Sequence, residues 1–155
     1  MADTLLRVGD KAPDFKVQGI PDGEYSLSKY HGQVVVLAFY PADNSPVFTT
    51  QMRAYSLDSG SFEGLNAVVL GISPQDVASH LGFASKHDIS IPLLSDPDKT
   101  VAKAYGVLGP LGFYRRSIFV IDRQGIVTYL RRSKAGLTYS PTSVLIDAIN
   151  QVEGK

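Results

Sequence analysis

The chain contains two continuous apolar runs, residues 34–40 and 67–72, that carry no charged side chain. Runs of this length and composition are typical of strands buried on both faces of a sheet. Between them, Phe48, Met52 and Tyr55 recur with the i, i+4, i+7 spacing of one helix face. A strand, a crossover helix and a second strand form a βαβ unit, in which the two strands lie parallel.

Ser-Pro pairs mark the predicted helix starts, because a hydroxyl suits the N-cap and a proline suits the first helical position. The pairs are Ser45-Pro46, Ser73-Pro74 and Ser140-Pro141. We expect the first helix to end at residues 59–61, and residues 62–66 to connect it to the next strand.

The second helix is predicted to use Ser73 as its N-cap, with Asp76 completing a capping-box pattern. Its apolar positions Val77, Leu81 and Ala84 are expected to face the core.

Shorter patterns complete the predicted order of elements. Before the first apolar run we expect a strand at 15–18, an edge strand at 25–27 and a helical turn at 28–31. The second helix is expected to end near 87–88, followed by a strand at 91–94, a helix at 100–105 and an irregular loop at 108–113. A hairpin of strands 117–121 and 126–130 and a last helix complete the chain, and the apolar face of that helix is Val144, Leu145, Ala148, Ile149 and Val152. This order predicts one α/β domain over residues 1–155, with a central mixed sheet flanked by helices. The thioredoxin fold with an N-terminal extension fits the arrangement.

The composition is that of an ordinary globular protein, with 44% apolar and 19% charged residues among 155. Lysine and arginine together number 15, as do aspartate and glutamate, so the formal net charge is zero. This balance gives no electrostatic reason to expect nucleic acid or an anionic membrane surface as a partner. No apolar run approaches the ~20 residues that span a bilayer, and residues 1–4 lack the pattern of a signal peptide, so we expect a cytoplasmic protein.

The chain contains no cysteine. Disulfides, thiolate metal sites and thiol redox chemistry are therefore excluded within these 155 residues. The three histidines, His31, His80 and His87, lack the i, i+4 spacing of helical metal pairs, so we expect no metal site. The serines form no G-x-S-x-G elbow and the glycines form no G-x-G-x-x-G or Walker pattern, so neither a hydrolase nor a nucleotide cofactor is expected.

Residues 39–51 lead from the first apolar run into the helix that begins at Pro46. This stretch resembles the active-site loop of the peroxiredoxins, the alkyl-hydroperoxide-reductase/thiol-specific-antioxidant family, and in particular its bacterioferritin-comigratory and one-cysteine branches. The family pattern is a proline, three residues, a threonine or serine, two residues and then the peroxidatic cysteine. Pro41, Ser45 and Phe48 occupy the three positions, so the framework matches and the reacting residue does not.

Two further segments resemble motifs of the same family. Residues 9–15 resemble its N-terminal Gly-Asp-x-Ala-Pro-Asp-Phe signature, and residues 115–122 form a third family-like motif. The resemblance extends over residues 8–152. It implies the peroxiredoxin type of thioredoxin fold and, as the family reaction, thiol-dependent reduction of hydroperoxides.

In the family, a cysteine thiolate attacks the peroxide O–O bond while a hydroxyl and a guanidinium hold the thiolate and the peroxide oxygens. By this resemblance, Ser45 supplies the hydroxyl, Arg116 supplies the guanidinium, and Pro41 shields the pocket from water. Phe48 has no nucleophilic atom, so covalent catalysis of this kind cannot occur at its position. Many members carry a second, resolving cysteine about five residues further on, near Arg53 here.

Each of these residues also has a plain structural interpretation. Phe48 shares a helix stripe with Met52 and Tyr55 and is expected in the core. Ser45 then serves as an N-cap, and Arg116 is a solvated or ion-paired member of a basic run.

We therefore expect a peroxiredoxin-family protein that lacks thiol peroxidase activity and acts as a binding or regulatory pseudoenzyme. It would bind a ligand between Ser45 and Arg116, or pair with a cysteine-bearing homologue. The alternatives are a variant of an active peroxiredoxin and an oxidoreductase that uses another chemistry on the same scaffold. The groups nearest to hand for such chemistry are Tyr40, Met52, Tyr55 and Arg116.

Family members commonly pair through the face near the active-site loop, so the resemblance implies a homodimer. Leu111, Phe113 and Tyr114 are expected to offer exposed apolar contacts for it.

Overall fold

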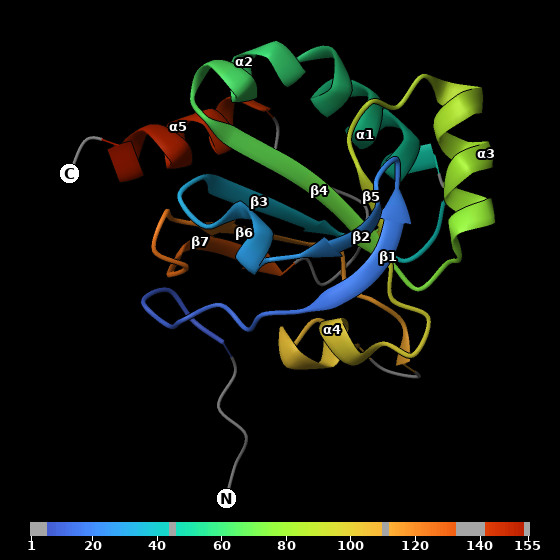
Figure 1. The fold of residues 1–155 in the computed structure, drawn as a ribbon, viewed down its shortest axis with the longest axis horizontal. Coiled ribbons are helices and arrows are strands. Elements are labelled where there is room, and N and C mark those ends of the chain that lie inside the picture. The colour runs from blue at the N-terminus through green and yellow to red at the C-terminus, as the bar shows by residue number, and fades with distance from the viewer. Residues whose placement is uncertain (1–5, 44–45, 110–111, 133–141, 154–155) are drawn as a thin grey trace, which may run out of the picture.

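The computed structural model describes residues 6–43, 46–109, 112–132 and 142–153. Within these residues a seven-stranded mixed sheet is flanked by helices (Figure 1). The strands are β1 Lys16–Ile20, β2 Gly23–Ser26, β3 Val34–Phe39, β4 Ala67–Ser73, β5 Leu93–Ser95, β6 Ser117–Ile121 and β7 Val127–Arg132. The helices are the 3-10 turn η1 Ser28–Tyr30, α1 Pro46–Leu57, α2 Ser59–Gly64, α3 Val77–His87, α4 Thr100–Ala104 and α5 Thr142–Glu153.

The sheet order is β2-β1-β5-β4-β3-β6-β7. Strands β3, β4 and β5 run parallel in the middle, and each neighbour outside this group pairs antiparallel. The predicted βαβ unit is confirmed as β3-α1-β4, with Val34 opposite Ala67 and Phe39 opposite Ile72. The predicted α/β class, with a mixed sheet and helices on both faces, is also confirmed.

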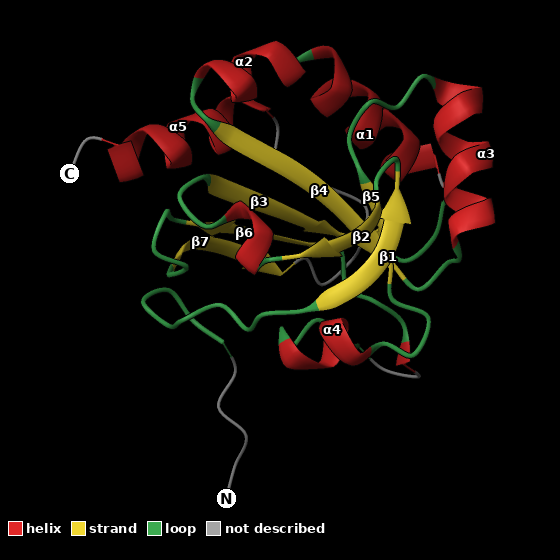
Figure 2. Cartoon of the chain, viewed as in Figure 1, coloured by secondary structure: helices red, strands yellow, loops and turns green. Residues whose placement is uncertain are grey.

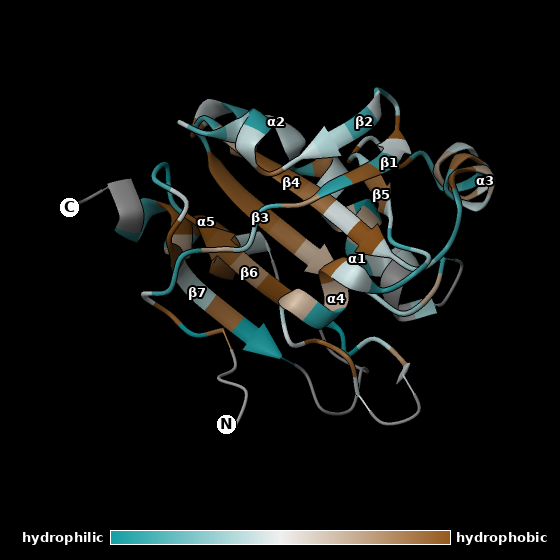
Figure 3. Ribbon diagram, turned by 60° about the horizontal axis from the view of Figure 1, so that its bottom comes forward, coloured by the Kyte–Doolittle hydropathy of each residue, from teal (hydrophilic) through white to brown (hydrophobic). Residues whose placement is uncertain are grey.

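Strand β3 divides its six buried residues between two cores, because successive strand side chains point to opposite faces. One core lies under α1, α2, α3 and α5 and receives Val34, Val36 and Ala38. The other lies under α4 and receives the alternate side chains of the strand, including Leu37 and Phe39. Figure 2 shows these helices on opposite sides of the sheet, and Figure 3 shows the apolar central strands between them. Each fully buried valine, leucine or phenylalanine side chain adds roughly 1.5–3 kcal/mol to the stability of the fold.

The connection predicted after the first helix is wrong, since residues 59–64 form the helix α2. Helix α1 ends at Leu57, whose side chain is 84% exposed, and the chain bends at Asp58. The bend brings Phe62 into the core, where its ring packs edge-on against Tyr55 at a centroid distance of 6.4 Å. The gain from burying this ring favours a second short helix over an extended link.

The predicted start of the second helix is also wrong. Ser73 is the last residue of β4 and pairs with Ser95, and α3 begins at Val77. Asp76 is the N-cap, and its carboxylate accepts a hydrogen bond from the Ser79 backbone N–H at 2.8 Å. The predicted end is confirmed, with Asp88 as a left-handed C-cap.

The inward face of α3 differs from the prediction. Leu81 is 54% exposed, whereas His80 and Phe83 are buried, together with part of Val77 and Ala84. His80 can take an interior position because its two ring nitrogens find polar partners there, which are described with the site.

The shorter elements lie within a few residues of their predictions. The last helix buries Leu145, Ala148 and Ile149 as expected, whereas Val144 is only half-buried. Ser140, Pro141 and the Val152 side chain lie outside the described residues. No helix among the described residues is long and apolar enough to cross a membrane.

Candidate functional site

The site expected from the sequence lies at the carboxyl end of β3 and the start of α1. Helix α1 begins at Pro46, as the Ser-Pro pair predicts. Pro41 is partly buried in the loop before it. Ser45 and the Phe48 side chain lie outside the described residues, and the Phe48 backbone belongs to the first turn of α1.

Arg116 reaches the same end of the sheet from β6. Strands β3 and β6 pair antiparallel with Phe39 opposite Ser117, so Arg116 lies at the level where β3 gives way to the loop. The side chain is buried, with 5% of the residue exposed, so the alternative of a solvated arginine is wrong. Burial lowers the pKa of the Arg116 guanidinium, although an arginine side chain stays charged in proteins.

The buried guanidinium contacts α1 directly. Arg116 Nη1 donates to the Gln51 side-chain oxygen at 3.4 Å, and the Gln51 amide nitrogen donates to the Tyr55 hydroxyl at 3.4 Å. Gln51 is itself buried. The structure therefore joins the start of β6 to the inward face of α1 by polar contacts, one turn beyond the position of Phe48.

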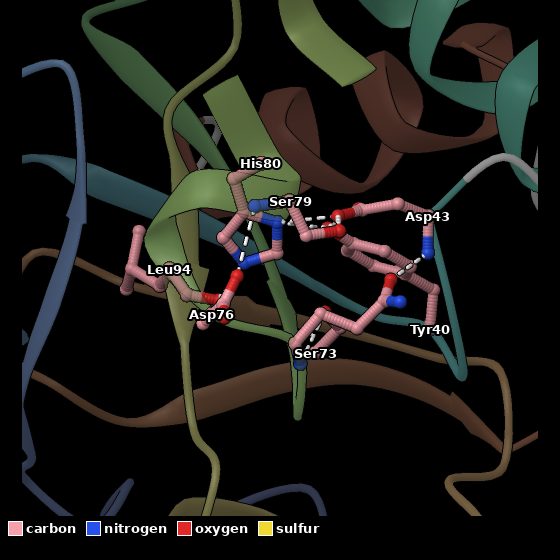
Figure 4. A network of polar contacts seen from close by, with 8 residues as sticks. Tyr40, Asp43, Ser73, Asp76, Ser79, His80 and Leu94 are labelled. Carbon is pink, nitrogen blue, oxygen red and sulfur yellow. Dashed lines mark hydrogen bonds and ion pairs between the residues drawn. The ribbon is translucent and has the colours of Figure 1, made fainter. Parts of the chain in front are cut away.

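A second polar cluster holds the loop from the side of α3 (Figure 4). The Asp43 carboxylate accepts hydrogen bonds from the Tyr40 hydroxyl at 2.8 Å and from Ser79 Oγ at 2.7 Å. It also lies 2.9 Å from His80 Nδ1. The Asp43 backbone N–H donates to the Gln75 side-chain oxygen. The loop is therefore tied to both the start and the first turn of α3.

The electrostatics of this cluster favour an ionised Asp43. Burial raises the pKa of the Asp43 carboxyl, but the hydrogen bond and charge of His80, with the Ser79 and Tyr40 hydroxyls, outweigh burial, and the pKa is lowered. Burial and the Asp43 charge raise the pKa of Tyr40 well above its ordinary value. Tyr40 is thus a neutral donor and Asp43 a buried anion at neutral pH.

Sequence reasoning missed Asp43 and His80 as site residues. No role was predicted for Asp43, and His80 was considered only as a metal ligand. A usable signal exists in the spacing of His80, three residues after Val77 and four before Ala84, which places it on their helix face. Among the described residues, no three His, Asp or Glu side chains gather as metal ligands.

The groups named for a non-cysteine chemistry lie in the core. Tyr40, Met52 and Tyr55 are each fully buried, and the hydroxyls of the two tyrosines lie in the hydrogen bonds described above. Met52 is therefore shielded from a dissolved oxidant in the folded chain.

A separate cavity of about 250 Å³ lies between α2 and the amino end of β4. Phe62, Val69 and Ile91 contribute to its apolar lining, with Glu63 among the residues at its wall. Because β3 and β4 run parallel, the amino end of β4 lies at the opposite end of the strands from Arg116 and Asp43, which lie near the carboxyl end of β3. The cavity is thus distinct from the loop site.

Comparison with protein families matches residues 8–130 to the AhpC/TSA family. The chain belongs to this family. Among curated relatives, the putative peroxiredoxin bcp of Helicobacter pylori is 39% identical over 79% of this chain and 85% of its own length. The chloroplastic 2-Cys peroxiredoxin BAS1 of Spinacia oleracea is 37% identical over 88% of this chain, which spans 56% of the length of that relative.

Solved peroxiredoxin structures share the fold. The reduced 2-Cys peroxiredoxin of Plasmodium vivax superposes with a TM-score of 0.87 at 30% identity, covering 96% of this chain and 99% of the other. The thioredoxin-like fold is thereby confirmed, as is the family resemblance carried by residues 9–15, 39–51 and 115–122. The relatives include both bcp and 2-Cys proteins, so kinship with the one-cysteine branch stays a prediction. Since this AhpC/TSA chain contains no cysteine, it lacks the thiolate that the family reaction requires.

Proposed function

We propose that this AhpC/TSA-family chain binds a small oxygen-rich ligand at the loop before α1 and does not reduce hydroperoxides. The observation that carries the proposal is a buried Arg116 guanidinium beside α1 in a chain without cysteine. In the family this framework surrounds a reacting thiolate, whereas here Phe48, which has no ionisable atom, stands at the position of the cysteine.

The chemistry of the guanidinium favours an oxyanion as ligand. A guanidinium presents five N–H donors in a planar fork, which fits two oxygens of one ligand better than a point charge does. Hydrogen bonds from a charged guanidinium to an oxyanion are stronger than those between neutral groups, so an oxyanion is the ligand that Arg116 favours. Burial strengthens this attraction, because charges interact more strongly where water is excluded.

Pro41 and Ser45 complete the proposed site. Pro41 follows β3 at the same end of the sheet as Arg116 and limits access of water to the loop. Ser45 precedes the first residue of α1, so its hydroxyl is proposed as a second donor to the ligand. The free N–H groups and the dipole of a helix start favour negative charge at the same place.

Pairing with a second chain also remains part of the proposal. A homodimer, or a pair with a cysteine-bearing homologue, would use the loop that contains Phe113, whose side chain is 65% exposed. Tyr114 does not serve, because it is buried and its hydroxyl donates to Asp96, and Leu111 lies outside the described residues. Sedimentation at several concentrations tests the pairing, and a monomer at the highest concentration would contradict it.

The cytoplasmic location expected from the sequence is a proposal of the same kind. One relative is named as chloroplastic, so location varies within the family. Fractionation of the source cells decides between the compartments.

Two measurements test the proposed function together. With hydrogen peroxide and a thioredoxin system, we expect reductant consumption no faster than without the protein, and clear turnover would overturn the proposal. In a titration with formate followed by amide NMR, we expect saturable shifts at Gln51 and along the start of α1. Arg116→Gln should abolish these shifts, and Arg131→Gln, on the exposed part of β7, should leave them unchanged.

A further inference from the structure

His80 joins three parts of the chain in the interior. Its ring is fully buried on α3, with Nδ1 2.9 Å from Asp43 Oδ2 and Nε2 3.0 Å from the Leu94 backbone oxygen (Figure 4). Asp43 belongs to the loop before α1 and Leu94 belongs to β5. The histidine therefore links the candidate site to strand β5.

The partners of the two ring nitrogens determine where its protons lie. A backbone carbonyl only accepts hydrogen bonds, so Nε2 must carry a proton to bond Leu94. An ionised carboxylate also only accepts, and Asp43 already accepts from the Tyr40 and Ser79 hydroxyls. Nδ1 must then carry a proton as well. A ring with protons on both nitrogens is an imidazolium cation.

The neutral form of the ring does not satisfy the same contacts. If His80 kept its proton on Nε2 for Leu94, the lone pair of Nδ1 would face the Asp43 carboxylate at 2.9 Å. The Tyr40 hydroxyl also lies 3.4 Å from Nδ1, but it donates to Asp43 over the shorter distance of 2.8 Å. If the proton moved to Nδ1, the Leu94 oxygen would lose its described donor from the ring. Either change weakens the link between the loop and α3 or that between α3 and β5, because a buried polar group left unpaired is costly.

From this geometry we propose that His80 is a positioning residue, whose imidazolium form holds Asp43 and thereby sets the loop between β3 and α1 for ligand binding. The proposal rests on the proposed function only for what the loop binds; the proton positions and the loop position follow from the described contacts. Loss of the His80 proton would release Asp43 and lower the affinity of the site for its ligand.

Among the residues that the structure describes, few other charged groups face the ring. From the end of β3 and the loop, Tyr40 and Asp43 face it, with the Tyr40 ring centroid 6.4 Å away. On α3 itself, Asp76 lies at the N-cap, is exposed and bonds the Ser79 backbone. Strand β1 packs against α3 and carries the exposed Lys16, while β5 contributes the Leu94 carbonyl. Asp43 is therefore the charged group in direct contact with the imidazole ring.

NMR of the histidine ring nitrogens tests the proton positions in the intact chain. At neutral pH we expect two protonated-type nitrogen signals for His80, assigned by their loss in His80→Gln. We also expect the amide signals of Asp43 and of Thr49 and Thr50 on α1 to shift as the ring loses its proton at higher pH. Measurements on the wild-type protein are sufficient for this test. A single protonated ring nitrogen at neutral pH, or amide signals that do not follow the protonation of the ring, would overturn the proposal.

A pH profile of formate binding tests the positioning role. In the wild type we expect the affinity to fall by about tenfold as the ring loses its proton, the loss associated with one charge-assisted hydrogen bond. His80→Gln should bind weakly with a flat profile, and His31→Gln, at an exposed position, should keep the wild-type profile. An unchanged profile in folded His80→Gln would refute the role. If formate does not bind at all, the proposed function fails, while the amide shifts still decide whether His80 sets the loop.

Discussion

Replacing Asp43 with asparagine tests how firmly the loop before α1 is held. Three donors, the Tyr40 hydroxyl, Ser79 Oγ and His80 Nδ1, lie 2.7–2.9 Å from the carboxylate. Asparagine has the same shape, but its NH₂ group would face at least one of these donors, and the His80 ring would lose its counter-ion. Removing one partner of a buried ion pair costs about 3–5 kcal/mol, so we expect the free energy of unfolding at pH 7 to fall by that amount.

The loss should depend on pH in one direction. The pKa of Asp43 is lowered in the folded chain, because the contacts with His80, Ser79 and Tyr40 outweigh the effect of burial. A carboxyl whose pKa is lowered by folding stabilises the fold above its unfolded pKa of about 3.9, and the stabilisation disappears as the pH falls through the folded pKa. The stability difference between wild type and Asp43→Asn is therefore expected to be full near pH 6–7 and to shrink below about pH 4.

Urea unfolding followed by circular dichroism at about pH 7, 5 and 3 measures this difference. Asp88→Asn is the matched control, because Asp88 is exposed and its left-handed backbone suits asparagine. Other carboxylates contribute equally to wild type and variant, so they cancel in the difference. A gap that stays constant from pH 7 to pH 3, or a loss at pH 7 no larger than that of Asp88→Asn, would refute the reasoning.

Two further substitutions test the packing and the inherited framework. Phe62→Ala should lower the free energy of unfolding by about 3–5 kcal/mol, because the ring is buried against Tyr55. Urea unfolding checks this, with exposed Leu57→Ala expected to cost little. Phe48→Cys places a thiol in the first turn of α1, where a helix start favours the thiolate, so we expect a single turnover with hydrogen peroxide at a rate above that of free cysteine. Stopped-flow kinetics measures it, and a folded variant no faster than free cysteine would contradict the framework.

The backbone elements around the loop could be predicted because their causes are local. The run at β3 is too apolar for any exposed position, and the Ser-Pro pair before α1 marks a helix start by the chemistry of two adjacent residues. Helix α2 could not be predicted in the same way, because its serine and glycine residues favour a turn. Formation of α2 is favoured by the burial of Phe62, which depends on packing against Tyr55 of α1.

The polar part of the site depends on contacts between distant residues. His80 and Asp43 are separated by 37 positions, and nothing near either residue identifies the other. The phase of α3 was mispredicted for the same reason, since an exposed Leu81 and a buried His80 reverse the usual preference. Arg116 was identified through its motif, whereas its burial and its contact with Gln51 required the structure.

The Asp43–His80 pair ties the loop before α1 to α3, and Arg116 contacts α1 from the start of β6, and stability alone does not account for these contacts. A buried ion pair is often no more stabilising than apolar side chains of similar volume, because desolvation offsets the attraction between the charges. The pair does, however, require one arrangement of Tyr40, Asp43, Ser79 and Leu94, since any other leaves a buried donor or acceptor unpaired. In a chain with no thiolate to orient, a loop specified in this way fits the proposed role of presenting the Arg116 guanidinium to a ligand in a defined geometry.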